Sequence, residues 1–553
     1  MRARPSLSAY YLAGACVALA GFVAGAALLA VTLPYHQWDS FGFGDWSLAI
    51  AQHGKFDPLF AGPQSAARPL FYELQGLVWS VTGISFTAGR LLSLVFAVVL
   101  AGSVYRLARA VTGTRLEAAL ALSVVLAVVP FSEQALTGQT DVPAAAMVAL
   151  AAALACRRPQ GRLALAALVV AAAAAVLTKQ TVLLALAPLA VFMLAGPLRD
   201  LRHRLRGPAG ALSAGLALGL AYDLVMAHRF GTSLSVFLRE GTGGIWAQLA
   251  AATRTDAVLR ADVLGSGLRL PLTFALFYSG LRLVRLRHRP ATLLALGAGL
   301  AWCIAGPLAA GVPNGAFSRP EDGFTLVGFA LVLAAAALLS EHDAPKRSTL
   351  ALALGLGLPT LVAWVDSATY TERLAAPAWP GLALLLGCVL GAGIRGLARA
   401  GTAFALAPLL VVAMAVWMSL ASLDGLHGAM WVEYRSLGVG GLGDSARTMH
   451  VVLPALQSTL ATVESQIGAG RVVTGDPMFP YFLPGRVDTS TPGRCSDVKG
   501  ETVFVLLTGN ESITEARQAG RLATPEQWSA CRSPKLRQLS DGTNGYAVFA
   551  VGG

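Results

Sequence analysis

Long apolar runs recur along this chain, and short polar loops separate them. A run of about 20 apolar residues can cross a bilayer as a helix, because a helix satisfies its own backbone hydrogen bonds in lipid. The chain is 55% hydrophobic and 13% charged, a composition that excludes an ordinary soluble protein of 553 residues. We therefore expect a polytopic α-helical membrane protein with about eleven to thirteen transmembrane helices. The predicted spans lie near residues 10–33, 88–109, 116–132, 141–156, 162–178, 180–198, 208–226, 268–284, 291–310, 323–340, 348–365, 379–395 and 402–421.

Basic residues gather in alternate loops, and the other loops carry mainly acids. The basic clusters are Arg106/Arg109/Arg115, Arg157/Arg158/Arg162, Arg199/Arg202/Arg204/Arg206, Arg282/Arg285/Arg287/Arg289, Lys346/Arg347 and Arg395/Arg399. This pattern predicts a cell-membrane protein whose N-terminus is cytoplasmic and whose chain after about residue 422 lies outside. The net charge of +12 therefore indicates orientation, and no nucleic-acid-binding signature accompanies it.

The chain divides into two predicted parts. Residues 1–424 form the transmembrane part, whose first outer loop, 34–87, is rich in aromatic residues typical of helices lying at the membrane interface. Residues 425–553 are predicted to form a small extracytoplasmic α/β domain, with a helix near 444–468 and strands near 471–474, 502–507 and 546–551. Cys495 and Cys531 lie in this tail and could form a disulfide in an oxidising compartment.

Several acids fall in the predicted outer segments. Asp39 and Asp45 stand among aromatic residues, where desolvation raises a carboxyl pKa and makes a better general base near neutral pH. Loop solubility or helix capping explains either acid as well, and on residue type alone weighs more. Asp141 can be read as a helix N-cap followed by Pro143 or as a functional acid, and nearby Glu133 is similarly open.

Three cations also fall on the outer side. Lys179 interrupts two apolar runs, and Arg68 and Arg373 lie in outer loops. Each could meet lipid headgroups at the interface or bind a phosphate. Outer carboxylates, outer cations and an apolar surround together suit transfer from a lipid-phosphate donor, because cations stabilise a departing phosphate and a carboxylate activates an incoming hydroxyl.

The order of these motifs resembles that of the GT-C superfamily of membrane glycosyltransferases, closest to the branch of protein O-mannosyltransferases and bacterial lipid A aminoarabinose transferases. The resemblance rests on Arg68-Pro69-Leu70-Phe71-Tyr72, Ala88-Gly89-Arg90-Leu91, Thr140-Asp141, Leu177-Thr178-Lys179 and Arg373-Leu374-Ala375-Ala376-Pro377. Two departures are visible: Gln180 replaces the family's glycine, and one proline is missing after Arg68.

The resemblance implies roles for these residues. An Asp of the first outer loop would be the catalytic base: Asp45 is favoured because Leu48-Ala49-Ile50-Ala51 resembles the helix after the family's acid, and Asp39 is the alternative. Arg68 and Lys179 would face a polyprenyl phosphate, joined by Arg373, and Asp141 would support the acceptor or the geometry of the site.

The resemblance also implies the reaction. A sugar would move, with inversion, from a polyprenyl-phosphate donor to a lipid, glycan or protein acceptor on the extracytoplasmic face. No cofactor is required, and the sequence contains no metal-ligand spacing, although a divalent cation is compatible with the chemistry. A transporter or flippase for lipid-linked sugars and a non-catalytic cell-envelope assembly protein are the alternatives.

Overall fold

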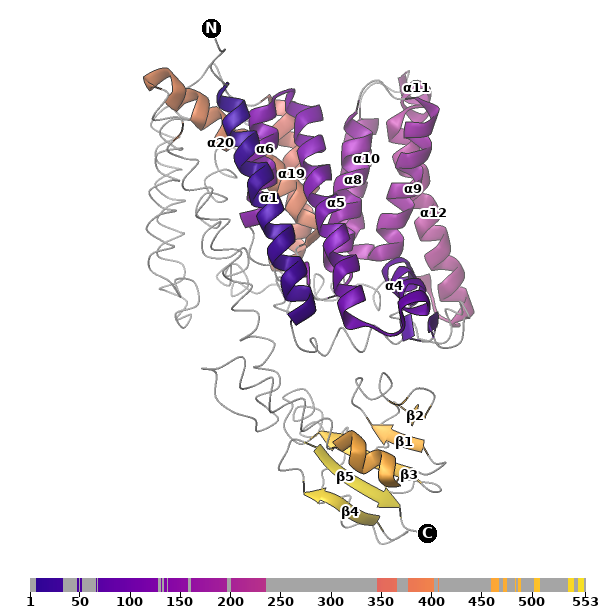
Figure 1. Ribbon diagram of the computed structural model, residues 1–553. Coiled ribbons are helices and arrows are strands. Elements are labelled where there is room, and N and C mark those ends of the chain that lie inside the picture. The colour runs from indigo at the N-terminus through magenta and orange to yellow at the C-terminus, as the bar shows by residue number, and fades with distance from the viewer. Residues whose placement is uncertain are drawn as a thin grey trace, which may run out of the picture. The chain divides into compact units, whose positions relative to one another are not determined.

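In the computed structural model (Figure 1), the contacts between residues group the chain into two compact units. The first, here the helical unit, comprises Met1–Val31, Asp57–Leu74 and Thr87–Ser422, and the second, here the sheet unit, comprises Thr32–Phe56, Gln75–Phe86 and Leu423–Gly553. The residues that the structure describes are 6–32, 47–48, 50–51, 66, 68–127, 131, 134–136, 138–157, 161–195, 200–234, 346–365, 376–401, 406, 459–466, 471–474, 483, 486–488, 502–507, 536–541 and 546–551.

Nine predicted spans coincide with described helices. They are α1 (Leu7–Thr32), α5 (Phe86–Thr112), α6 (Arg115–Ala127), α8 (Asp141–Cys156), α9 (Arg162–Thr178), α10 (Leu183–Leu194) with the 3₁₀ turn η2 (Gln180–Val182) before it, α12 (Pro208–Arg229), α19 (Arg347–Val365) and α20 (Trp379–Ala400). The predicted spans near 268–284, 291–310, 323–340 and 402–421 lie outside the described residues, apart from residue 406.

Within the described part, four helices are long and apolar enough to cross a membrane: Leu7–Ala30, Thr87–Thr112, Pro208–Arg229 and Ala376–Arg399. Three apolar helices are shorter, at Asp141–Cys156, Arg162–Thr178 and Gln180–Leu194. The chain is thus a mainly helical, multi-pass membrane protein, as its sequence predicts.

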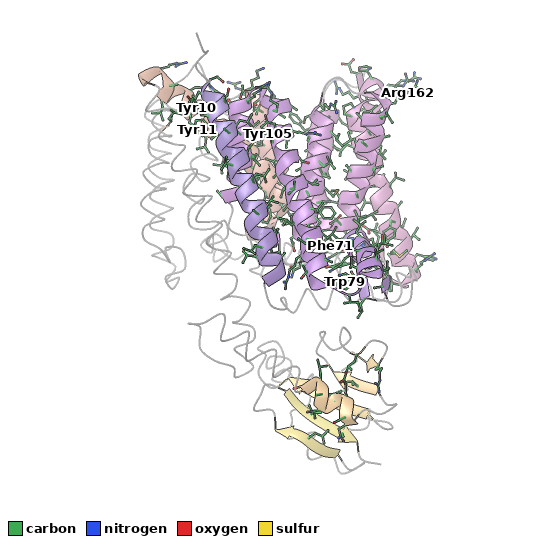
Figure 2. All side chains as sticks on the ribbon, in the orientation of Figure 1. Tyr10, Tyr11, Phe71, Trp79, Tyr105 and Arg162 are labelled. Carbon is green, nitrogen blue, oxygen red and sulfur yellow. The ribbon has the colours of Figure 1, made fainter. Side chains whose placement is uncertain are left out.

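The helical bundle has two chemically different ends. We call the end that carries Arg106, Arg157 and Arg204 the basic end, and the end where α8 begins and α9 finishes the distal end. Figure 2 shows Tyr105 and Arg162 at the basic end and Phe71 at the distal end.

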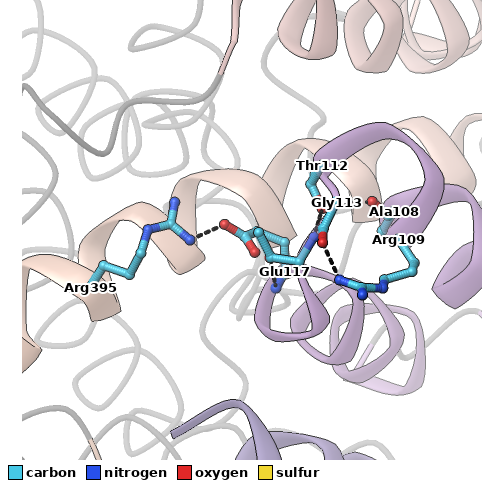
Figure 3. Close-up of polar contacts among 7 residues, drawn as sticks. Ala108, Arg109, Thr112, Gly113, Glu117 and Arg395 are labelled. Atoms are coloured by element: carbon cyan, nitrogen blue, oxygen red, sulfur yellow. Dashed lines mark hydrogen bonds and ion pairs between the residues drawn. The ribbon is translucent and has the colours of Figure 1, made fainter. Parts of the chain in front are cut away.

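Glycines allow the helices to approach closely. A Cβ added at Gly219 of α12 would lie 2.5 Å from Val176 Cβ of α9, and one at Gly387 of α20 would lie 2.8 Å from the Glu117 carbonyl oxygen of α6. Small residues at helix contacts are typical of membrane bundles, where close van der Waals packing replaces the hydrophobic effect. An ion pair between Glu117 and Arg395 joins α6 to α20 (Figure 3).

A five-stranded sheet forms the main element of the sheet unit. Its strands are β1 (Arg471–Thr474), β2 (Val487–Asp488), β3 (Thr502–Leu507), β4 (Leu536–Asp541) and β5 (Tyr546–Val551), in the order β2-β1-β3-β5-β4. β1 runs parallel to β2 and β3, whereas β5 runs antiparallel to β3 and β4.

The predicted strands coincide with β1, β3 and β5, and the sequence analysis missed β2 and β4. Of the predicted helix near 444–468, only 459–466 are described, and these residues are helical. The predicted boundary between 424 and 425 lies outside the described residues. That the tail is a separate extracytoplasmic domain stays a prediction.

Candidate active site

A buried ion pair joins the ends of α8 and α9 at the distal end. The Lys179 ammonium, directly after α9, pairs with the Asp141 carboxylate, the first residue of α8, and the two residues are 2% and 3% exposed. Extended backbone at Lys179 ends α9 and turns the chain into η2. Asp141 is therefore not the N-cap that the sequence suggested: Thr140 precedes the helix, and the Asp141 side chain reaches across to Lys179.

A second buried polar contact lies one residue further along the chain. The Gln180 side-chain amide donates to Asp223 Oδ1 of α12 at 3.2 Å, and Asp223 is 0% exposed. Asp223 Oδ2 and Thr181 Oγ1 have no hydrogen-bond partner among the described residues. A carboxylate buried inside an apolar helix is costly, so Asp223 is a functional candidate. The sequence analysis missed it; its signal was a lone acid near the end of an apolar run.

The residue before Asp223 reaches a different segment. The Tyr222 hydroxyl donates to the Ala66 carbonyl oxygen at 3.3 Å, two residues before Arg68. Arg68 itself is 8% exposed and lies directly before α4 (Pro69–Thr82). Adjacent residues of α12 therefore hold the Arg68 segment and the Lys179 turn, which brings the two predicted phosphate-binding cations to the same end of the helical unit.

Aromatic packing fixes the start of α4. Phe71 and Tyr72 are buried, and the Phe71 ring meets the Phe96 ring of α5 edge to face, with centroids 6.0 Å apart. Such contacts contribute specific geometry in addition to apolar burial. They hold the backbone next to Arg68 against α5.

The segment after Asp45 is tied to the same helix. Ser47 donates a hydrogen bond from its hydroxyl to the Gln75 side-chain oxygen of α4 at 3.1 Å. At the next residue of α4, a Cβ added to Gly76 would lie 2.8 Å from Ile50 Cβ, so a side chain there would clash with the helical residues that follow Ser47. α4 thus contacts the chain two residues after Asp45 and begins directly after Arg68.

Glu73 of α4 is a further acid with an unusual environment. Burial raises its pKa from 4.5 to about 7, and its charge acts on the Tyr222 hydroxyl. A carboxyl group that titrates near neutral pH can exchange protons under working conditions. Glu73 lies in the first predicted outer loop, 34–87, and the sequence alone assigns no role to it.

The other predicted site residues, Asp39, Asp45, Glu133, Arg373, Cys495 and Cys531, lie outside the described residues. Their predicted roles, and the predicted disulfide, stay predictions. In the described part of the chain, no group of three or more His, Cys, Asp or Glu side chains could hold a metal ion.

One family model matches the part of the chain that contains Arg68, Asp141 and Lys179. Residues 65–222 match the family model described as dolichyl-phosphate-mannose-protein mannosyltransferase. No curated protein matches the sequence.

Two solved structures have a similar fold. The crystal structure of ArnT from Cupriavidus metallidurans bound to undecaprenyl phosphate is 14% identical, with a TM-score of 0.52 and coverage of 99% of each chain. The apo structure of the same protein is 14% identical, with a TM-score of 0.54 and coverage of 96% of this chain and 97% of that one. The family model therefore confirms the resemblance to the GT-C membrane glycosyltransferases over residues 65–222, and the two structures show a similar fold over almost the whole chain.

Proposed function

We propose that this protein is a membrane glycosyltransferase that moves a sugar from a polyprenyl-phosphate donor to an acceptor on the extracytoplasmic face. The acceptor hydroxyl or amine attacks the anomeric carbon from the side opposite the phosphate. The bond between that carbon and the phosphate oxygen breaks, the new glycosidic bond forms with inversion, and the polyprenyl phosphate leaves. This displacement needs no cofactor, and the proposal requires no metal ion.

The observation that carries this proposal is that two adjacent residues of α12 form hydrogen bonds to the segments that contain the two predicted phosphate-binding cations. Tyr222 holds the backbone beside Arg68, and Asp223 holds Gln180 beside Lys179. Cations at one end of a bundle can stabilise the charge that develops on a departing lipid phosphate. The match to the mannosyltransferase family model spans Arg68, Asp141, Lys179 and Tyr222, and the similar ArnT structure was solved with undecaprenyl phosphate bound.

The general base in this proposal is an aspartate of the first outer loop. Asp45 is favoured over Asp39 because it lies two residues before Ser47, whose hydrogen bond to Gln75 ties this part of the loop to α4. Its carboxylate would accept the acceptor proton as the new bond forms.

Before the donor binds, Lys179 is paired with Asp141. Because Asp141 neutralises its ammonium, the pair would hold the cation in place at a lower electrostatic cost than an unpaired buried ammonium until a donor phosphate arrives. Arg68 would supply the second charge, and Arg373 and Glu133 are proposed to complete the phosphate and acceptor sides.

The proposal can be tested with purified full-length protein and a panel of radiolabelled polyprenyl-phosphate sugars. We expect one label to move to an acceptor from cell-envelope extract. Asp45→Asn or Asp39→Asn should abolish transfer while the protein still folds, and Asp57→Asn, in the same outer segment, is the matched control. Full activity in both single variants and in the double variant would contradict the catalytic claim. Movement of the labelled lipid across vesicle membranes without transfer would instead indicate a flippase.

A further inference from the structure

A large cavity opens at the basic end of the helical unit, away from Asp141 and Lys179. Its volume is about 1210 Å³, and its described walls come from the C-terminal parts of α5, α8 and α10, from α11 (Leu201–Leu205) and the start of α12, and from α19. None of the residues that carry the proposed reaction lines it.

The cavity carries positive charge on one part of its wall. Arg106, Arg109, Arg157 and Arg204 line it together with His203, and the described lining contains no Asp or Glu. Arg109 donates to the Gly113 carbonyl oxygen (Figure 3), and Arg204 pairs with the half-exposed Asp200 at 3.7 Å. Within the described residues, no ion pair engages Arg106 or Arg157. Guanidinium groups that converge on one hollow form a natural site for phosphate oxygens.

The remaining wall is apolar. Leu150, Leu154, Phe192, Met193 and Leu352 line it, and Phe192 is 45% exposed. A site for a small soluble anion has no use for a wide apolar wall, and the volume far exceeds that of a phosphate ion. Arginines beside apolar side chains at a membrane helix end match a phospholipid, whose phosphate and acyl chains need both surfaces.

Orientation alone does not account for this arrangement. Arg115, Arg162 and Arg202 carry the same loop charges at the basic end, yet they do not line the cavity. The positive-inside pattern requires only that cations lie in these loops, whereas here arginines from α5, from α11 and from the residue directly after α8 line one cavity.

We propose that this cavity binds an anionic phospholipid of the leaflet at the basic end, which the charge pattern predicts to be cytoplasmic. The headgroup phosphate lies against the arginines, and an acyl chain lies along Phe192 and Leu352. Anionic phospholipids are abundant on cytoplasmic membrane faces, and basic pockets between helices are known to hold their headgroups. This site is independent of the proposed transfer reaction.

The first test uses the intact protein in neutral detergent and counts bound lipid by native mass spectrometry. Tetraoleoyl cardiolipin and dioleoyl phosphatidylglycerol should bind at least tenfold more tightly than dioleoyl phosphatidylcholine. Arg106→Gln combined with Arg157→Gln should weaken cardiolipin binding at least tenfold, and the matched control, Arg115→Gln with Arg162→Gln, should change it less than twofold. Equal loss in both double variants, or equal binding of phosphatidylcholine by the wild type, would overturn the proposal.

A second measurement needs no variant. Phosphatidylglycerol with a diazirine in one acyl chain should label peptides containing Phe192 or Met193, and excess cardiolipin should compete with this labelling. Competition by millimolar inorganic phosphate instead would indicate a site for a soluble anion and would overturn the lipid proposal. Labelling spread evenly over all lipid-facing helices would overturn it as well.

Discussion

At the scale of single residues, the distal end buries three ionisable side chains, Asp141, Lys179 and Asp223, and burying such groups in an apolar bundle costs free energy. Lys179 and Asp141 neutralise each other, whereas Asp223 is met only by the neutral amide of Gln180 among the interactions described above. Charged groups removed from water need partners, and the three side chains come from three different helices or helix ends. Each can therefore be tested separately.

The ion pair should behave as a buried salt bridge. Asp141→Asn or Lys179→Met alone leaves one uncompensated charge, and we expect each to lower the free energy of unfolding by about 3–5 kcal/mol. The double variant removes both charges and should recover most of that loss. Thermal unfolding in detergent, measured on all four proteins, checks this. A double variant that is as unstable as the sum of the singles would show that the two side chains do not stabilise each other.

Lys179 also has a predicted role in donor binding that stability alone does not test. In the stable double variant, the phosphate cation is absent although the fold is restored, so transfer should require a higher donor concentration. An unchanged KM for the donor in Asp141→Asn/Lys179→Met would contradict the phosphate role of Lys179 while leaving its structural role intact.

Asp223 should matter for transfer through its hold on Gln180. Asp223→Asn keeps the shape of the side chain but removes its charge, and we expect kcat/KM to fall about tenfold, which corresponds to about 1.4 kcal/mol. Thr360→Val is a suitable control because Thr360 Oγ1 is also buried without a hydrogen-bond partner in the described part of α19. Equal activities of the two variants would remove Asp223 from the site.

Glu73 should make stability depend on pH. Its pKa is about 7 in the folded protein and 4.5 in the reference state, so the folded protein retains the Glu73 proton between these values while the unfolded chain loses it. The contribution of Glu73 to stability is thus fully present below about pH 4.5 and is lost as the pH rises to about 7. The difference in Tm between wild type and Glu73→Gln should therefore fall across this window, and a difference that stays constant with pH would contradict this role of Glu73.

At the scale of helices, packing of α20 on α6 depends on glycines that leave no room for a side chain. A Cβ at Gly391 would lie 2.7 Å from Glu117 Cγ, and one at Gly387 would lie 2.8 Å from backbone. The same surface contains the ion pair between Glu117 and Arg395. Close approach and charge pairing therefore reinforce each other at this contact.

Gly387→Ala should separate these helices. Because the obstacle is the backbone of α6, which cannot rotate away as a side chain can, we expect a loss of about 1–3 kcal/mol. Gly355→Ala in α19 is the control, since a Cβ there meets nothing within 4 Å and alanine favours helices. Thermal unfolding that is equally unaffected in both variants would contradict the close contact.

The sequence was sufficient for helix positions but not for helix partners. Apolar runs bounded by arginines located nine described helices, because a membrane span leaves a strong hydrophobic signal over about 20 residues. The pairing of Lys179 with Asp141 was missed because the two residues are 38 positions apart and each looked complete on its own, one as an interfacial lysine and one as a cap. β2 was missed because it has only two residues, and β4 because Leu536–Asp541 alternates too weakly in polarity.

At the scale of the whole molecule, the two ends of the helical unit require different compartments. The proposed lipid cavity belongs to the basic end, and the proposed transfer site belongs to the distal end. α12 runs between them, from Pro208 at the basic end to Arg229 at the distal end, and both Arg202 and Arg229 are exposed.

The orientation of the helical unit can be measured at two exposed positions, Arg202 of α11 at the basic end and Arg229 of α12 at the distal end. In a background without the six native cysteines, a membrane-impermeant maleimide on intact cells should modify Arg229→Cys but not Arg202→Cys, and permeabilised cells should allow both reactions. The two variants remove the same charge from exposed positions, so they control for each other. Modification of Arg202→Cys alone would invert the predicted topology and would place the candidate active site in the cytoplasm.

The contact between the start of α8 and the end of α9 also bears on how the protein is made. These helices are consecutive and the turn between them lies at the basic end, so Asp141 and Lys179 stand at the two open ends of one hairpin, which the predicted topology places outside the cytoplasm. Delivering an isolated ammonium through hydrocarbon is expensive, and a lone carboxylate is similarly penalised. When Asp141 and Lys179 have already paired in the nascent chain, the two ends of the hairpin together carry no net charge. Both helices can then enter the bilayer together.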